Sequence, residues 1–374
     1  MTELTPSVSR RAVLKAGAAA GWALGTVASA AAGSDTRTEL DSRTTITEPG
    51  VYALPDDVSM REFGGVVIRA DDVVIDGRGT VLRAGVDPEG RPGEAADEGV
   101  RPSEPGIGTD ESVRNVTVRD LTVSGWYVGV WLQNVTDATI ENVTATDNGV
   151  GIVLERATGS TIADSTAARN DEDGIALRST TESTVLKSDA DRNGRAGIAL
   201  VNADDNAVRE VDVSRNDGDG VVLERADRNE LSTVASSGDT AGVVLVSARA
   251  NALSDLDIDR SGFAGVALGH ASANELAGLT VSNAVGDDPL AAEPSAIWLY
   301  SASENRFDDV ASENNGEWTI YARDDSAENR FDDLAIDGGE AFSVTVTDEA
   351  VDRDENVVPV LGSDDDSVPV SMWG

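Results

Sequence analysis

A four-residue pattern recurs through the middle of the chain: Gly, an aliphatic residue, any residue, then Leu. Its seven copies begin at Gly129, Gly151, Gly174, Gly197, Gly220, Gly242 and Gly265. The steps between them are 22, 23, 23, 23, 22 and 23 residues. A fixed period of this length is typical of a solenoid, in which each repeat forms one coil.

A second apolar row and a recurring Asn accompany this pattern. The row consists of Val118, Ile140, Ile162, Val185, Val208, Leu231, Leu253, Leu276, Phe307 and Phe331. Two positions before six of these residues stand Asn206, Asn229, Asn251, Asn274, Asn305 and Asn329. Because alternate residues of a strand point to opposite faces, the aliphatic residue and the Leu point inward and the residue between them points outward. We expect the Asn side chains to bond backbone groups and one another along the stack.

These patterns predict an all-β fold, a right-handed parallel β-helix of about ten coils with N- and C-terminal caps. Helical repeats are excluded because no apolar 3.6-residue period persists. The predicted segments are a signal peptide (1–33), an N-terminal cap (34–64), the β-helix (65–337) with a long loop (84–112) and an insertion (285–294), and a C-terminal cap (338–374).

The N-terminus has the features of an export signal. Residues 9–15 read Ser-Arg-Arg-Ala-Val-Leu-Lys, which matches a twin-arginine motif, and an uncharged Ala/Gly-rich run follows to Ala32. This run is short and weakly apolar, so it indicates a processed signal rather than a membrane span. We therefore expect an extracellular or cell-surface protein without a transmembrane span after signal removal.

Charge narrows the range of partners. The chain carries 68 Asp plus Glu against 29 Lys plus Arg, a formal net charge of −39. Such self-repulsion opposes compaction, but molar salt shortens the Debye length to ~3 Å and removes most of that cost. The composition is typical of a salt-adapted protein of the haloarchaeal kind. The lack of a basic excess excludes nucleic acid as a partner.

The supply of metal ligands is equally restricted. The sequence has no Cys, three Met and a single His, His270. Copper and zinc sites draw on imidazole or sulfur ligands, so a transition-metal site is not expected. No cofactor is predicted, although calcium, which binds carboxylate and carbonyl oxygens, stays compatible with the composition.

The repeat resembles a known family. Its rhythm, and the segments Thr-Glu-Pro-Gly-Val-Tyr-Ala-Leu (47–54) and Val-Val-Ile-Asp-Gly-Arg-Gly-Thr-Val-Leu (73–82), resemble right-handed β-helix proteins that include pectate-lyase-like enzymes. They are similar to the repeat region of NosD, a periplasmic accessory protein of nitrous-oxide reductase. The resemblance covers residues 44–336. It implies the fold, and for NosD-like proteins it implies an accessory role for a membrane complex, associated with copper delivery.

Acidic turns before the Gly positions form one candidate site. The candidate catalytic residues are Asp171, Asp173, Arg195, Asp217, Asp219 and Asp239. Equivalent positions in successive coils lie ~5 Å apart, and paired carboxylates at ~5–10 Å are the arrangement that glycoside hydrolases use. A polysaccharide lyase or glycoside hydrolase would use these groups. The alternative is a solvated, salt-bridged turn of a halophilic protein.

Aromatic residues at the outward positions form a second candidate site. The candidate substrate-binding residues are Trp126, Tyr127, Trp131, Trp298, Tyr300 and Tyr321. Aromatic faces suit stacking on sugar rings, so a polysaccharide or cell-surface glycan is the expected partner. The alternative is that the loop 84–112 and the insertion 285–294 cover these side chains.

Three Asn-Val-Thr sequons, at Asn115, Asn134 and Asn142, are candidate glycosylation sites.

The leading hypothesis for the function is an exported cell-surface β-helix protein that binds carbohydrate or a surface partner. The alternatives are a polysaccharide lyase or glycoside hydrolase, and a NosD-like accessory protein.

Overall fold

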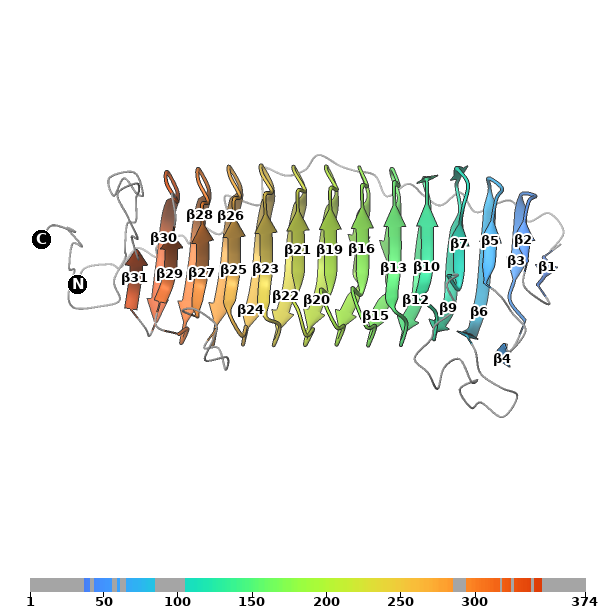
Figure 1. Ribbon diagram of the computed structural model, residues 1–374, viewed down its shortest axis with the longest axis horizontal. Helices are drawn as coiled ribbons and strands as arrows, with labels where there is room; N and C mark the ends of the chain where they lie inside the picture. Colours follow the sequence, from blue (N-terminus) through green and yellow to red (C-terminus); the bar gives the residue numbers. More distant parts are fainter. Residues whose placement is uncertain are drawn as a thin grey trace, which may run out of the picture. The chain divides into compact units, whose positions relative to one another are not determined.

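The computed structural model describes residues 37–40, 44–55, 59–60, 65–84, 105–284, 294–316, 318–323, 326–337 and 340–344. These ranges form a parallel β-solenoid of about 11 turns (Figure 1), close to the ten coils predicted, and they contain no helix. All of them lie in one compact unit, 37–374. The predicted signal peptide lies outside the described residues.

Two parallel sheets run along the solenoid. Sheet B contains β2 (Thr45–Ile46), β5 (Val66–Ile68), β7 (Ile107–Thr109), β10 (Val128–Gln133), β13 (Val150–Glu155), β16 (Ile175–Arg178), β19 (Ile198–Val201), β21 (Val221–Glu224), β23 (Ala241–Val246), β25 (Ala264–Gly269), β27 (Ser295–Tyr300), β29 (Trp318–Arg323) and β31 (Glu340–Val344), in that spatial order. Each strand therefore pairs with its equivalent one coil away.

Sheet A has sixteen strands and carries the second apolar row. Its strands are β1 (Thr38–Glu39), β3 (Gly50–Ala53), β4 (Ser59–Met60), β6 (Val73–Ala84), β9 (Thr117–Ser124), β12 (Thr139–Thr146), β14 (Thr161–Ala163), β15 (Thr166–Ala168), β17 (Thr184–Leu186), β18 (Asp189–Asp191), β20 (Ala207–Ser214), β22 (Glu230–Ser237), β24 (Ala252–Asp259), β26 (Glu275–Ser282), β28 (Arg306–Glu313) and β30 (Arg330–Asp337). A small third sheet pairs β8 (Val113–Arg114) with β11 (Val135–Thr136).

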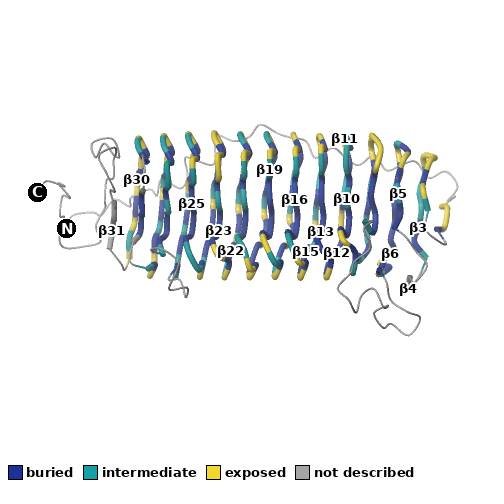
Figure 2. The backbone as a smooth tube through the Cα atoms, viewed as in Figure 1, coloured by how far each residue is buried: buried dark blue, intermediate teal, exposed yellow. Residues whose placement is uncertain are grey.

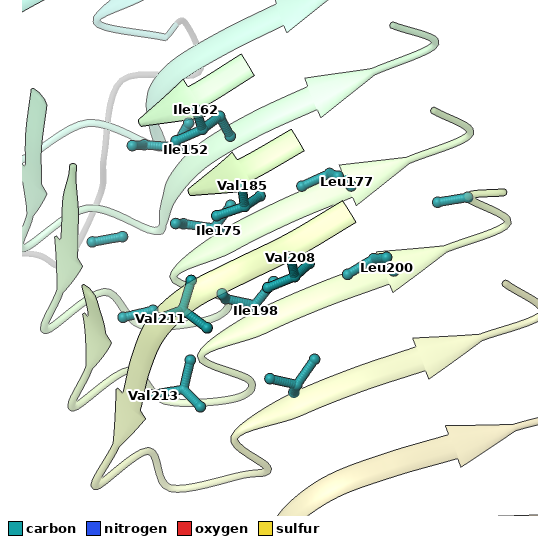
Figure 3. Packing of buried hydrophobic residues seen from close by; sticks show 14 of the residues in the cluster. Ile152, Ile162, Ile175, Leu177, Val185, Ile198, Leu200, Val208, Val211 and Val213 are labelled. Carbon is teal, nitrogen blue, oxygen red and sulfur yellow. The ribbon is translucent and has the colours of Figure 1, made fainter. Parts of the chain in front are cut away.

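The core is a stack of identical positions. Ile152, Ile175 and Ile198 pair in register on neighbouring strands of sheet B, and all three are fully buried (Figure 3). Val185 and Val208 of sheet A form the facing stack. Buried residues follow the strands, and the exposed ones gather at the turns (Figure 2). The inward face predicted from the alternation is therefore confirmed.

The predicted Asn ladder is also confirmed. The backbone N–H of Asn229 donates to Asn251 Oδ1 at 2.8 Å, and the Asn229 amide donates to the same oxygen at 3.1 Å. The Asn229 amide also donates to the carbonyl of Ala203, one coil back, at 2.9 Å. The same three bonds recur at Asn206 and Asn251, so each buried amide ties three coils together.

A second ladder was not predicted. It runs through Asn148, Asn170, Asn193 and Asn216, in the turns before the repeat Gly, and all four are buried. The second ladder also explains why the repeat position is Gly. A Cβ on Gly151 would lie 2.8 Å from the amide nitrogen of Asn170 and 2.4 Å from the Gly174 carbonyl oxygen, so a side chain there would displace the ladder.

Strands of the two sheets lie beyond the predicted β-helix boundaries at three places. Within the predicted loop 84–112, Ile107–Thr109 pairs with β5 and β10 as an ordinary rung of sheet B. Within the predicted N-terminal cap, β2 and β3 already join sheets B and A. Beyond the predicted end at residue 337, β31 adds a further strand to sheet B. Residues 85–104, 285–293 and 345–374 lie outside the described residues.

Candidate functional site

Four aromatic side chains form a continuous row, two of them on β27 of sheet B and two in the turns that flank β25. Trp298 and Tyr300 alternate on β27, and their rings stack with centroids 5.8 Å apart and an interplanar angle of 7°. Phe263 meets Trp298 edge-on at 5.4 Å, and His270 meets Tyr300 edge-on at 5.2 Å. We call these four residues the aromatic row. It crosses two adjacent coils, because β25 pairs directly with β27.

An open notch adjoins the row. Gly269 pairs with Tyr300 on one side and with Val246 on the other. A Cβ placed on Gly269 would meet nothing within 4 Å, and the Val246 side chain is 37% exposed. Stacked strands lie ~4.8 Å apart, so the notch separates Tyr300 from Val246 by ~10 Å. This width admits a ring-sized apolar or sugar surface beside Tyr300.

Tyr321 does not extend the row. It pairs with Trp298 one coil further along, but its side chain is only 4% exposed. It therefore has almost no surface for a ligand. The sequence placed Trp298 and Tyr321 at equivalent outward positions. In the structure Trp298 is partly exposed, whereas Tyr321 is buried.

The three predicted aromatic residues near β10 also differ from one another in exposure. Trp126 is 1% exposed, and its indole N–H donates to the Leu82 carbonyl at 3.3 Å, so it is a core residue with no face for a ligand. Trp131 is half-buried against Val153, and its indole N–H donates to Glu155 at 3.1 Å. Tyr127 is 49% exposed.

Asp239 belongs to the scaffold rather than to the surface. It is 2% exposed and ends the second ladder, accepting the Asn216 backbone N–H at 2.7 Å and the Asn216 amide at 3.0 Å. Its other oxygen accepts the Ser236 hydroxyl at 2.7 Å. Burial raises the pKa of the Asp239 carboxyl to about 6, although these hydrogen bonds oppose the shift. Its burial leaves no path to a large substrate.

Asp173 and Asp219 each accept a hydrogen bond from a backbone N–H of the next coil. Asp173 accepts the Ala196 N–H at 3.4 Å and pairs with Arg178 at 3.4 Å and Arg195 at 3.9 Å. Asp219 accepts the Ala241 N–H at 3.1 Å. Burial raises the pKa of the Asp219 carboxyl, and the hydrogen bond from Ala241 partly offsets that rise.

The remaining acidic candidates, Asp171 and Asp217, are exposed at the turns. Within the described ranges, no group of three or more His, Asp or Glu side chains is placed to hold a metal ion.

The three sequon Asn residues all lie in left-handed turn conformations, with φ of 53° at Asn115, 55° at Asn134 and 51° at Asn142. Asn115 and Asn142 are exposed and donate to Asp72 and Asp120, respectively. Asn is one of the few residues that tolerates this conformation, which accounts for its presence independently of glycosylation.

Comparison with known families agrees with this geometry. The family described as "Right handed beta helix region" matches residues 106–253, and the family described as "Periplasmic copper-binding protein (NosD)" matches residues 219–333. The chain is a right-handed β-helix repeat protein with NosD-like repeats. No curated protein matches the sequence.

Solved β-helix structures superpose on most of this repeat protein at low identity. The A-module of the Azotobacter vinelandii mannuronan C-5 epimerase AlgE4 has a TM-score of 0.55 at 16% identity, covering 83% of this chain and 91% of its own. The periplasmic alginate epimerase AlgG has a TM-score of 0.53 at 16% identity, covering 72% and 76%. The Dettilon tailspike has 0.55 at 13% identity, covering 80% of this chain, which spans 61% of the tailspike. Identities this low show the fold alone.

The side chains of this sequence do not fit the copper named in the NosD description. Copper sites use imidazole or sulfur ligands. His270 is the sequence's single imidazole, it contacts the Tyr300 ring, and the sequence has no Cys. In the part of the chain that the structure describes, no helix is long and apolar enough to cross a membrane.

The sequence singled out Trp298 and Tyr300 but missed Phe263, His270 and Gly269. A usable signal existed for Gly269. In earlier coils, the position of Gly269 is occupied by larger residues: Gln133, Glu155, Arg178 and Val201. Gly269 therefore stands out as a small residue at this position, in the coil next to that of Tyr300.

Proposed function

We propose that this NosD-like repeat protein is an exported cell-surface protein that binds a polysaccharide through the aromatic row. The observation that carries the proposal is the row itself, four aromatic side chains gathered beside the open notch at Gly269. Aromatic rings combine a large apolar surface with polar edges, which suits the apolar faces and hydroxyl rims of sugar rings.

Two further observations support the proposal. Proteins of the same fold are named for action on mannuronan or alginate, and another, the Siphovirus 9NA tailspike fragment, is titled a receptor binding domain. The twin-arginine motif at residues 9–15 and the periplasmic NosD family favour a location outside the cytoplasm.

Tyr300→Ala tests the row. We expect it to weaken binding of the recognised glycan by about tenfold, the loss typical of one well-packed aromatic contact. Binding is measured on a glycan array and then by calorimetry in molar salt, where the charge of −39 is screened. Leu186→Ala is the control, because Leu186 is a half-buried apolar residue on β17 of sheet A, outside the row. Equal affinities for the Tyr300→Ala and wild-type proteins would refute the proposal.

A second candidate function is polysaccharide cleavage by a lyase or glycoside hydrolase. One observation favours it: Asp219 is partly exposed at a turn, and burial raises the pKa of its carboxyl. A carboxyl with a raised pKa can act as a general acid.

Asp219→Asn should abolish any glycan-degrading activity of the wild type while leaving glycan affinity intact. Release of reducing ends or unsaturated sugars measures the activity. Absence of both products from neutral and acidic glycans with the wild-type protein would exclude this candidate.

A further inference from the structure

Sheet A carries a hollow that none of the predicted site residues lines. It lies over β6, β9 and β12, which are direct neighbours in the sheet (Figure 1). Its volume is about 380 Å³, and Arg83, Ser124, Gly125 and Arg169 are among its lining residues. A second hollow of about 330 Å³ shares Thr122 with it, so the two adjoin. These volumes fall within the range of small-molecule sites, ~300–1,000 Å³.

The local sequence makes the hollow. Strand β6 shifts register against β9 between Asp76 and Thr80, which breaks the regular stacking at this end of the solenoid. Gly79 follows at φ 84°, and a Cβ there would meet nothing within 4 Å. Gly125 lies at φ 81° against Ala84. Gly79 therefore leaves space in the smaller hollow, and Gly125 and Ala84 leave space in the hollow beside Arg83.

Arg83 is an unusual residue in this protein. Most described arginines pair with Asp or Glu, as Arg169 does with Asp147 at 3.2 Å. Arg83 is exposed and has no ion pair or side-chain hydrogen bond in the described part of the chain. The carboxylate among the hollow's described lining residues, Asp147, is bound by Arg169. The chain has a net charge of −39, so an arginine of the hollow that has no carboxylate partner among the described residues is a candidate for anion recognition.

Hydroxyl groups lie beside it. Arg83 pairs in register with Ser124, and Thr122 pairs with Thr144 on the next strand. Thr146 accepts a hydrogen bond from Arg169 at 2.9 Å. The surface thus combines several hydroxyls with a guanidinium that no described residue pairs. A guanidinium recognises a carboxylate or sulfate through two parallel hydrogen bonds, and hydroxyls pair with the hydroxyls of a sugar.

We propose that this hollow binds an acidic sugar unit, with Arg83 paired to its carboxylate or sulfate and the Thr and Ser hydroxyls of β9 and β12 bonded to its hydroxyls. The site is separate from the aromatic row, which lies on sheet B. It stands whether or not the aromatic row binds a glycan.

The test uses the full-length protein in ~1 M KCl, where long-range repulsion by the protein's charge is screened. Calorimetry measures the affinity for three oligosaccharides of equal length: an oligogalacturonate, a sulfated oligosaccharide and a neutral one. We expect at least one acidic probe to bind, and Arg83→Gln to weaken it by about tenfold or more. Arg83→Lys should give an intermediate affinity. The binding acidic probe identifies the anion as carboxylate or sulfate.

Arg249→Gln is the matched control, because Arg249 is exposed and also has no ion pair within the described ranges, but lies in a distant turn. Unchanged binding of the acidic probe by Arg249→Gln supports the assignment to the hollow beside Arg83. Equal weakening by Arg249→Gln would overturn the proposal, because it would indicate attraction to positive charge in general. Failure of both acidic probes to bind the wild type, or full binding by Arg83→Gln, would also overturn it.

Discussion

Asp239→Asn should stabilise the protein above pH 6 by about 3 kcal/mol. The folded-state pKa of this buried carboxyl is about 6, against an ordinary value of 3.8. Each unit of difference corresponds to ~1.4 kcal/mol. Below pH 3.8 the carboxyl is protonated in both states and costs nothing. As the pH rises toward 6, the unfolded state ionises first, so wild-type stability falls, and above pH 6 the whole penalty is present.

Asn removes this penalty and fits the position. The preceding ladder residue, Asn216, already donates from its amide to a backbone carbonyl one coil back. The Ser236 hydroxyl can turn from donor to acceptor. Urea unfolding at pH 4, 5, 7 and 8 measures the difference, with Asp217→Asn as the exposed control. A stabilisation of the same size at pH 4 and pH 8 would contradict this explanation.

Asn251→Ala should destabilise the protein by about 3–5 kcal/mol. Asn251 is 1% exposed, and its amide donates to the Ala226 carbonyl at 3.0 Å and to Asn274 at 3.0 Å. Its oxygen accepts both the backbone N–H and the amide of Asn229. Truncation leaves several buried polar groups without partners, each costing ~1–3 kcal/mol.

Asn251→Asp separates hydrogen bonding from volume. It keeps the acceptor for Asn229 but loses the donor to Ala226, and it buries a carboxyl. Its stability should therefore fall with rising pH, as the wild type does at Asp239. Chemical unfolding measures the free energy of unfolding of both variants. Thr280→Ala, a change on the outer face of β26, is the control. A loss below ~1 kcal/mol for Asn251→Ala would show that water replaces the amide.

The sequence could predict most of the scaffold because its signal is periodic. Ile152, Ile175 and Ile198 stack as the alternation requires, and the ladder through Asn251 follows from an Asn repeated at one turn position. The second ladder was missed because Asn170 and Asn193 occur among charged turn residues. Side-chain direction in a turn depends on local backbone dihedrals, which alternation does not determine.

The candidate site was harder to predict because it depends on departures from the repeat. Trp298 and Tyr321 occupy equivalent outward positions, yet only Trp298 joins the aromatic row, since burial depends on the particular neighbours of each coil. Trp126 lies in a turn, where it folds into the core. The hollow beside Arg83 arises from a register shift and from glycines outside the repeat pattern. None of these features recurs, so the periodic signal carries no information about them.

The ladder through Asn274 has a consequence for how such a protein acquires new surfaces. Its backbone N–H and amide bond Asn305 at 3.1 and 2.9 Å across a step of 31 residues, while the preceding step, Asn251 to Asn274, spans 23. Extra residues before β27 therefore leave the bonding between coils intact. A turn that precedes a sheet B strand can lengthen without loss of register, so evolution can vary the surroundings of the aromatic row while the stack beneath it stays constant.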